Sequence, residues 1–294
     1  MAMQRRGQGR TVERLAAFAD TAADFGAREV SRPWAETYVA VSIAAAIAHM
    51  SNGAATTLSG GAAALLAGVG VDAVRRAEAR DLRRGAEVVL GALVAVALAG
   101  AARLVPTGIG LLIVIALGLL ALRAVVEWEL RLRRVPGGAT HRDRVGARAV
   151  ATFLLFAASL GAVALVPGIV SIPDTPSARL DPVGPLAILA VGIANAGIAM
   201  ALAARMATLR RERTSGVVRD ALGAGVLNGA ASIAFAALGA SRLAGPAGLA
   251  VLFYARELWA ATPEGERLDP RLILEILVLV LATGLALLWI GVGR

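Results

Sequence analysis

Nine apolar stretches follow one another along the chain and are separated by polar connections. Each has a length within the range of about 17 to 25 residues that a helix needs to cross a bilayer. They cover residues 34–51, 57–74, 86–104, 108–128, 149–167, 184–204, 219–239, 244–260 and 272–292. The pattern predicts an all-α, polytopic transmembrane bundle of nine spans. Eight is the alternative, because the second stretch is short and rich in Gly and Ala, while Pro246 and Arg256–Glu257 lie in or beside the eighth.

The segment before the first apolar stretch has a different pattern. Between residues 11 and 30, apolar side chains such as Val12, Leu15, Phe18 and Phe25 recur at three- and four-residue steps, with charged residues between them. This periodicity predicts an amphipathic helix that lies in the membrane interface or packs on the bundle. The chain therefore divides into a cytoplasmic N-terminal segment, 1–33, and a transmembrane helical domain, 34–294.

Arginine is distributed unevenly between the connections. If the nine stretches alternate in direction, 26 of the 30 basic residues lie on the side of the N-terminus and 4 lie on the other. Cytoplasmic connections of membrane proteins carry excess positive charge. We therefore expect a multi-pass protein of the cell inner (plasma) membrane, N-terminus in and C-terminus out, with segments 75–85, 129–148 and 208–218 on the cytoplasmic side.

The composition agrees with this class and excludes several others. Apolar residues make up 57% of the 294 residues and charged residues only 17%, which is unlike an ordinary soluble enzyme. Cysteine and lysine are absent and there are two histidines, so disulfides, zinc–thiolate sites and Schiff bases are excluded, and we expect no tightly held metal. The net charge of +9 does not indicate nucleic-acid binding, because the arginines are spread over five short loops without interleaved aromatic residues.

Few polar side chains fall within the apolar stretches. Asn195 and Asn228 lie near the middle of the sixth and seventh stretches, and His49 lies near the outer end of the first. A polar residue inside a membrane is a candidate functional residue by default. The two asparagines have two interpretations, hydrogen bonding between helices or contact with a ligand. His49 has no second ligand at metal-binding spacing and is interpreted as an interfacial residue.

Acidic and basic residues cluster where the second and sixth stretches end. The first cluster contains Asp72, Arg75, Arg76 and Glu78, and the second contains Arg213 and Asp220. Guanidinium groups bind phosphate in a bidentate manner. These residues are therefore a candidate cytoplasmic site for an anionic lipid or a prenyl diphosphate, held by arginine without a metal. The alternative interpretation is ordinary cytoplasmic arginine with local ion pairs.

The layout resembles the UbiA-type membrane prenyltransferase superfamily. The resemblance covers about residues 31–290 and rests on the nine-span plan, Arg32–Pro33 before the first span, the basic stretch from Leu130 to Pro136, and the polar loops after spans two and six. It implies a lipid-filled bundle with prenyl-transfer chemistry at its cytoplasmic end and Mg²⁺ as cofactor.

The sequence departs from that family at the metal-binding signatures. If Asp72 is the last acid of the family's Asn-Asp-x-x-Asp-x-x-x-Asp motif, the other positions fall on Ala64, Leu65 and Gly68, none of which binds Mg²⁺. The second signature is replaced by arginine-rich sequence with Glu212 and Asp220.

Three functions remain open at this point. The first is a UbiA-like lipid-handling protein, either a divergent prenyltransferase or a non-catalytic relative. The second is a transporter or channel for a small solute, motivated by Asn195, Asn228 and a short repeat in which residues 52–56, Asn-Gly-Ala-Ala-Thr, resemble residues 228–232, Asn-Gly-Ala-Ala-Ser. The third is a structural subunit of a membrane complex.

Overall fold

The computed structural model describes residues 31–78, 85–134, 139–166, 184–210, 212–238, 240 and 243–262, together with separate positions between 270 and 281. Within this part the regular structure is entirely helical, which confirms the predicted all-α class. The helices are α2 (Arg32–Met50), α3 (Ala54–Glu78), α4 (Ala86–Leu104), α5 (Ile109–Arg134), α6 (His141–Leu165), α7 (Pro185–Leu209), α8 (Thr214–Ala237) and α9 (Ala244–Ala261). The predicted amphipathic helix over 11–30 and most of the ninth stretch lie outside the described residues.

Six of these helices are long and apolar enough to cross a membrane. They cover Ala54–Ala77, Glu87–Leu104, Ile109–Leu132, His141–Leu165, Pro185–Leu209 and Thr214–Ala237 in the described part of the chain. The chain thus has the character of a membrane protein. Helices α2 and α9 coincide with the first and eighth predicted stretches, but they are not among the six.

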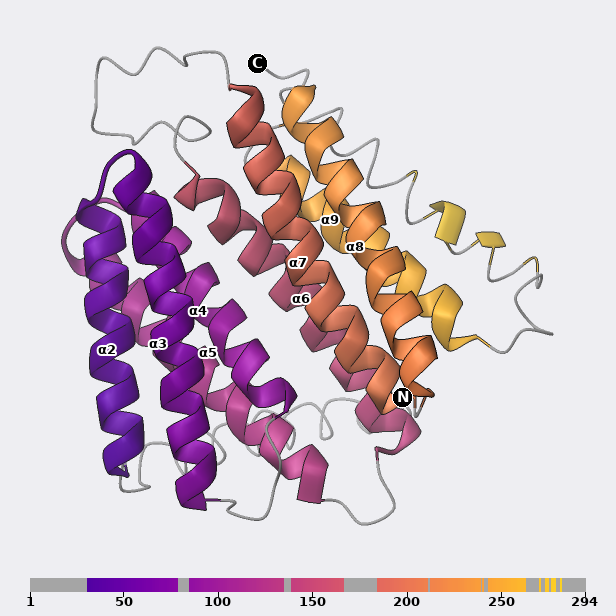
Figure 1. Ribbon diagram of the computed structural model, residues 1–294, viewed down its shortest axis with the longest axis horizontal. Coiled ribbons are helices and arrows are strands. Elements are labelled where there is room, and N and C mark those ends of the chain that lie inside the picture. The colour runs from indigo at the N-terminus through magenta and orange to yellow at the C-terminus, as the bar shows by residue number, and fades with distance from the viewer. Residues whose placement is uncertain are drawn as a thin grey trace, which may run out of the picture.

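The described helices form an up-and-down bundle (Figure 1). Helices α2, α4, α6 and α8 run in one direction, and α3, α5, α7 and α9 run in the other. The C-terminal ends of α3, α5 and α7 therefore lie at one end of the bundle, which we call the arginine end because Arg75, Arg131 and Arg210 lie there. We call the other end the opposite end.

Helix α4 is the centre of the packing, since it contacts α2, α3, α5 and α6. Its approach to α6 is closest at Gly100 and Gly161. A Cβ on Gly100 would lie 2.2 Å from the Cα of Gly161, and a Cβ on Gly161 would lie 2.5 Å from the carbonyl oxygen of Val96. Small residues at a crossing let two helix backbones meet in this way. The contact joins the first four described helices to the last four.

Helices α7 and α8 form the most extensive helix pair. Gly192 receives the side chain of Ile233, and Gly225 receives that of Met200. Gly197, also in α7, has nothing within 4 Å of the place where a Cβ would lie. It takes no part in the packing of α7 on α8. Only some of the abundant glycines therefore mark helix contacts.

The outward surface of the bundle is apolar. On α5, Leu112, Leu117 and Leu120 are each more than half exposed, and Phe153 of α6 is 69% exposed. A soluble monomer rarely exposes contiguous apolar surface on this scale, because water contact with it is unfavourable. The acyl chains of a bilayer are the medium in which such a surface is stable.

Helix α6 starts eight residues earlier than its apolar stretch. Thr140 caps it: the backbone N–H of Asp143 donates to Thr140 Oγ1 at 3.2 Å, and the N–H of Thr140 donates to Asp143 Oδ2 at 2.9 Å. This reciprocal capping satisfies donors that the first turn leaves free. It carries α6 beyond the apolar stretch toward the arginine end.

The short repeat does not correspond to equivalent positions. Asn52 lies in the turn between α2 and α3, whereas Asn228 is buried in the middle of α8. The two segments therefore differ in local structure, and the repeat gives no support for an internal symmetry.

Candidate functional site

The first predicted cluster forms a compact ion-pair group at the end of α3. Asp72 accepts from Arg75 Nη2 at 2.8 Å through one oxygen and from Arg76 Nε at 3.0 Å through the other. Arg75 also approaches Glu87 of α4, with 3.9 Å between its Nε and the carboxylate. Asp72, Arg75 and Glu87 are buried, whereas the Arg76 side chain is 65% exposed. The group therefore ties α3 to α4 and leaves one arginine facing outward.

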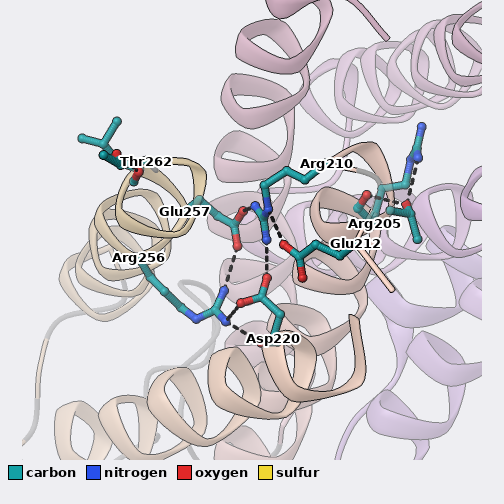
Figure 2. A network of polar contacts seen from close by, with 9 residues as sticks. Arg205, Arg210, Glu212, Asp220, Arg256, Glu257 and Thr262 are labelled. Atoms are coloured by element: carbon teal, nitrogen blue, oxygen red, sulfur yellow. Dashed lines mark hydrogen bonds and ion pairs between the residues drawn. The ribbon is translucent and has the colours of Figure 1, made fainter. Parts of the chain in front are cut away.

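A larger network joins the ends of α7, α8 and α9 (Figure 2). Arg210 lies at its centre, donating to Glu257 at 2.6 Å, to Glu212 at 2.7 Å and to Asp220. Arg256 donates to Glu257 at 2.8 Å and also to the carboxylate of Asp220. Glu257 is fully buried, so the network is a protected structural contact between three helices.

The charge state of Arg210 follows from two opposing effects. Burial lowers its pKa, but the neighbouring carboxylates of Glu257, Glu212 and Asp220 outweigh burial and hold the pKa above its ordinary value. Arg210 therefore stays a cation, and its positive charge is already matched by acids of the chain.

The predicted site residues are divided between these two places. Asp72, Arg75 and Arg76 lie together at the end of α3, and Asp220 lies in the α7–α9 network, on the other side of the bundle in Figure 1. Arg213 is exposed at the start of α8. The side chain of Glu78 is outside the described residues. Their predicted role in binding one head group stays a prediction.

The two asparagines differ in what they contact. Asn195 Nδ2 donates to Ser232 Oγ at 2.8 Å, which links α7 to α8. Asn228 Nδ2 donates to the carbonyl of Ala224 in its own helix at 3.1 Å. Both Oδ1 atoms are buried and have no hydrogen-bond partner in the protein. Asn195 thus bonds between helices, which is one of its two interpretations, and it also lines a pocket with Ser232.

At the opposite end, Arg103 of α4 binds the turn that follows α2. It donates to the carbonyl of Ser51 and, at 2.9 Å, to Thr56 Oγ1. His49 Nδ1 lies 2.8 Å from the carbonyl oxygen of Ala102, so this ring is held by backbone and is not placed as a metal ligand. These contacts attach the turn between α2 and α3 to the C-terminal end of α4.

An apolar groove lies between α5 and α6. Both helices pack on α4 but scarcely touch each other, so α4 forms the floor of the groove. The groove has a volume of about 380 Å³ and is lined almost wholly by apolar side chains. They include Leu98, Leu117, Gly118, Phe153, Ala157 and Leu160.

The groove becomes polar toward the arginine end. A second cavity of about 330 Å³ shares Val125 and Val150 with it and is also lined by Glu127, Trp128 and Arg131. Glu127 pairs with Arg123 at 2.8 Å and lies 3.6 Å from Arg131. The Arg131 side chain is 58% exposed. One end of a long apolar groove therefore carries two arginines against one acid.

The sequence pattern does not predict this groove or its polar end. In the sequence Arg131 belongs only to the basic stretch from Leu130 to Pro136, and Glu127 and Trp128 form part of no predicted site. Their spacing does contain a signal, because residues 123, 127 and 131 follow at four-residue steps and therefore lie on one helix face. The separation of α5 from α6 has no comparable signal in the sequence.

The described residues do not fit the magnesium–diphosphate chemistry of the UbiA-type family. Both oxygens of Asp72 are occupied by arginines, and Asp220 lies in a different network. Magnesium bound through diphosphate requires converging carboxylate oxygens. Within the part of the chain that the structure describes, three or more acids or histidines nowhere converge in that way.

Comparison with known proteins adds no relative. No family model matches the chain, and no curated protein or solved structure is similar to it at a significant level. The six apolar helices and the groove between α5 and α6 define the class, which is a helical membrane protein with a lateral apolar groove. The likeness to the UbiA-type family stays a resemblance of layout.

Proposed function

We propose that this chain is a lipid-handling protein of the inner (plasma) membrane, which binds an anionic lipid in the groove between α5 and α6. In the proposed topology, the chain crosses the membrane nine times, its N-terminus is cytoplasmic, and the arginine end of the bundle faces the cytoplasm. This topology is supported by the six apolar helices and by the uneven distribution of arginine.

The observation that carries the proposal is the amphiphilic shape of the groove. An apolar channel with a floor of α4 continues into a cavity that contains Trp128 and Arg131. An acyl or prenyl chain would fit such a channel through van der Waals packing, since lipid tails are already in apolar surroundings, and the Arg131 guanidinium would bind a phosphate oxygen. Tryptophan is common at the depth where chain and head group meet.

The proposal concerns binding and assigns no catalytic step. A prenyl diphosphate and a phospholipid share the required chemistry, a phosphate head and a long apolar tail. The transporter alternative is favoured by a different observation, the separate small pocket that Asn195 and Ser232 line.

Photolabelling tests the groove. The purified protein in nanodiscs is irradiated with phosphatidylglycerol that carries a diazirine in one acyl chain, and adducts are located by peptide mass spectrometry. We expect adducts on the groove-lining segments of α4, α5 and α6. An Ala157→Trp variant should abolish them by filling the groove, whereas Ala62→Trp, on the exposed face of α3, should not.

The head-group contact is tested by charge removal. An Arg131→Gln variant should lower labelling by phosphatidylglycerol about tenfold, because a hydrogen bond to a charged group contributes about 1.5–3 kcal/mol. It should leave labelling by the zwitterionic phosphatidylcholine analogue little changed. Arg142→Gln, an exposed arginine at the same end, is the control.

Two further arms decide between alternatives. If Arg76→Gln has the larger effect, the head group binds at the end of α3, as the sequence predicted. Competition by farnesyl diphosphate, with and without EDTA, distinguishes a prenyl ligand from a phospholipid and a metal bridge from direct arginine contact. Uniform labelling that no variant changes would contradict the proposal.

A further inference from the structure

A small cavity lies among α6, α7, α8 and α9, on a different part of the bundle from the groove. It has a volume of about 60 Å³, and its lining includes Val163, Asn195, Ser232, Phe235, Ala240 and Leu249. At about 10–15 Å³ for each water-sized group, it holds about four to six non-hydrogen atoms. Its occupant is therefore small.

The cavity contains a buried acceptor without a partner. Asn195 is 1% exposed, and its Nδ2 is already used by Ser232. Its Oδ1 has no hydrogen-bond partner in the protein. A buried acceptor that stays unpaired is destabilising by about 1–3 kcal/mol, so native structures pair such atoms with protein, water or ligand. A donor in the cavity that Asn195 lines would pair this oxygen.

The rest of the lining defines the chemistry of the occupant. Apart from Asn195 and Ser232 the lining side chains are apolar, and none of them is charged. A charged ligand would lose its hydration without compensation there. Two further hydroxyls, Ser159 Oγ and Thr152 Oγ1, are buried without partners on the same face of α6, below Val163. The site suits a neutral molecule with one hydroxyl or amide donor and a small apolar part.

The cavity is closed toward the arginine end. Phe253, which is fully buried, follows Leu249 by one turn of α9, and Glu257 with its ion-pair network follows by one more. At the other side Ala240, in the connection between α8 and α9, is exposed and lines the cavity. The exposed part of the lining therefore lies toward the opposite end.

We infer that this cavity is a binding site for a small neutral hydrogen-bond donor, of the size and polarity of a four-carbon alcohol, which donates to Asn195 Oδ1. The inference does not depend on the lipid groove, because the two cavities have no lining residue in common.

The test uses 3-azibutanol, a photoreactive short alcohol, on the full chain in detergent. We expect adducts on Val163 and on residues within 191–195, 232–240 and 245–249, and we expect n-butanol to reduce them. An azi-alkane of the same length without a hydroxyl should label these segments about three- to tenfold less, which corresponds to one hydrogen bond of about 0.5–1.5 kcal/mol.

Variants assign the contact. Asn195→Leu should reduce labelling to the level of the alkane probe, whereas Asn228→Leu removes a buried amide that does not line the cavity and should not reduce it. Ala236→Phe should fill the cavity and should therefore also reduce labelling by the alcohol, without changing Asn195. Size-exclusion elution and thermal unfolding identify a variant that fails to fold, and n-butanol competition in the unaltered chain does not depend on any variant.

Three results would overturn the inference: equal labelling by alcohol and alkane, full labelling of Asn195→Leu, or adducts only outside these segments. Each would show that Asn195 Oδ1 does not bind a hydrogen-bond donor in this cavity. Ala157→Trp in the lipid groove should leave alcohol labelling unchanged, so failure here and failure of the lipid proposal give different results.

Discussion

At the scale of single residues, the buried acids and arginines at the ends of α7, α8 and α9 are paired with one another. Arg210, Asp220, Arg256 and Glu257 come from three helices and meet where water is excluded from Glu257. A buried ion pair adds little net stability over an apolar contact, but loss of one partner leaves an unmatched charge. The network therefore contributes most by specifying which helix ends meet.

Removal of Glu257 tests this. We expect Glu257→Ala to lower the free energy of unfolding by about 3–5 kcal/mol, because Arg210 and Arg256 lose a buried partner. Unfolding in mixed detergent and SDS, followed by tryptophan fluorescence, measures the change.

The matched control is Glu36→Ala. Glu36 pairs with Arg32 at 2.8 Å, but both side chains are largely exposed, so the loss should be at most about 1 kcal/mol. Equal losses for Glu36 and Glu257 would show that burial of the network does not matter.

At the scale of elements, the sequence predicted where the helices lie better than where they end. All eight apolar stretches that fall on described residues coincide with a helix. The boundaries differ because hydropathy changes at the membrane surface, while hydrogen bonding and capping continue the helix into water. Helix α6 begins at His141 through its Thr140 cap, and α3 continues past its stretch to the arginines that hold Asp72.

The candidate sites were less predictable, because their partners are far apart in sequence. The Asp72 group is local, and its spacing of three and four residues made it visible. Arg210 and Glu257 are 47 residues apart, so their pairing depends on how α7 and α9 pack. The groove depends on two helices that do not pack on each other, a property that no local pattern encodes.

The crossing of α4 and α6 gives a second stability prediction. Gly161→Ala places a methyl group 2.5 Å from a backbone oxygen of α4, so the helices must separate. We expect a loss of about 1–3 kcal/mol, as for other overpacked contacts. The same unfolding assay measures it.

Gly197→Ala is the comparison, since nothing lies within 4 Å of its added methyl group. Alanine is the better helix former by about 0.5–1 kcal/mol, so this variant should be as stable as the original chain or more stable. A stable Gly161→Ala variant would mean that α4 and α6 do not approach this closely in the membrane.

At the scale of the whole molecule, the alternation of the helices predicts which connections share a side. The chain has no cysteine, so single cysteines report accessibility without background. Cysteines replacing His141 and Ser215 are at the arginine end, and one replacing Asn52 is at the opposite end.

In intact cells, a membrane-impermeant maleimide should label the cysteine at position 52 and should label positions 141 and 215 only after the membrane is opened. Labelling of all three positions from one side would contradict the bundle arrangement. The reverse pattern would preserve the bundle but invert the proposed orientation.

The side opening of the groove between α5 and α6 has a consequence for how occupancy must be expressed. A ligand that enters from between acyl chains arrives by diffusion in two dimensions and never passes through water. Its relevant concentration is its mole fraction among the lipids. Diluting vesicles of fixed composition should leave occupancy unchanged, whereas doubling the proportion of the anionic lipid should raise it. The occupancy of such a groove would therefore follow the lipid composition of the bilayer.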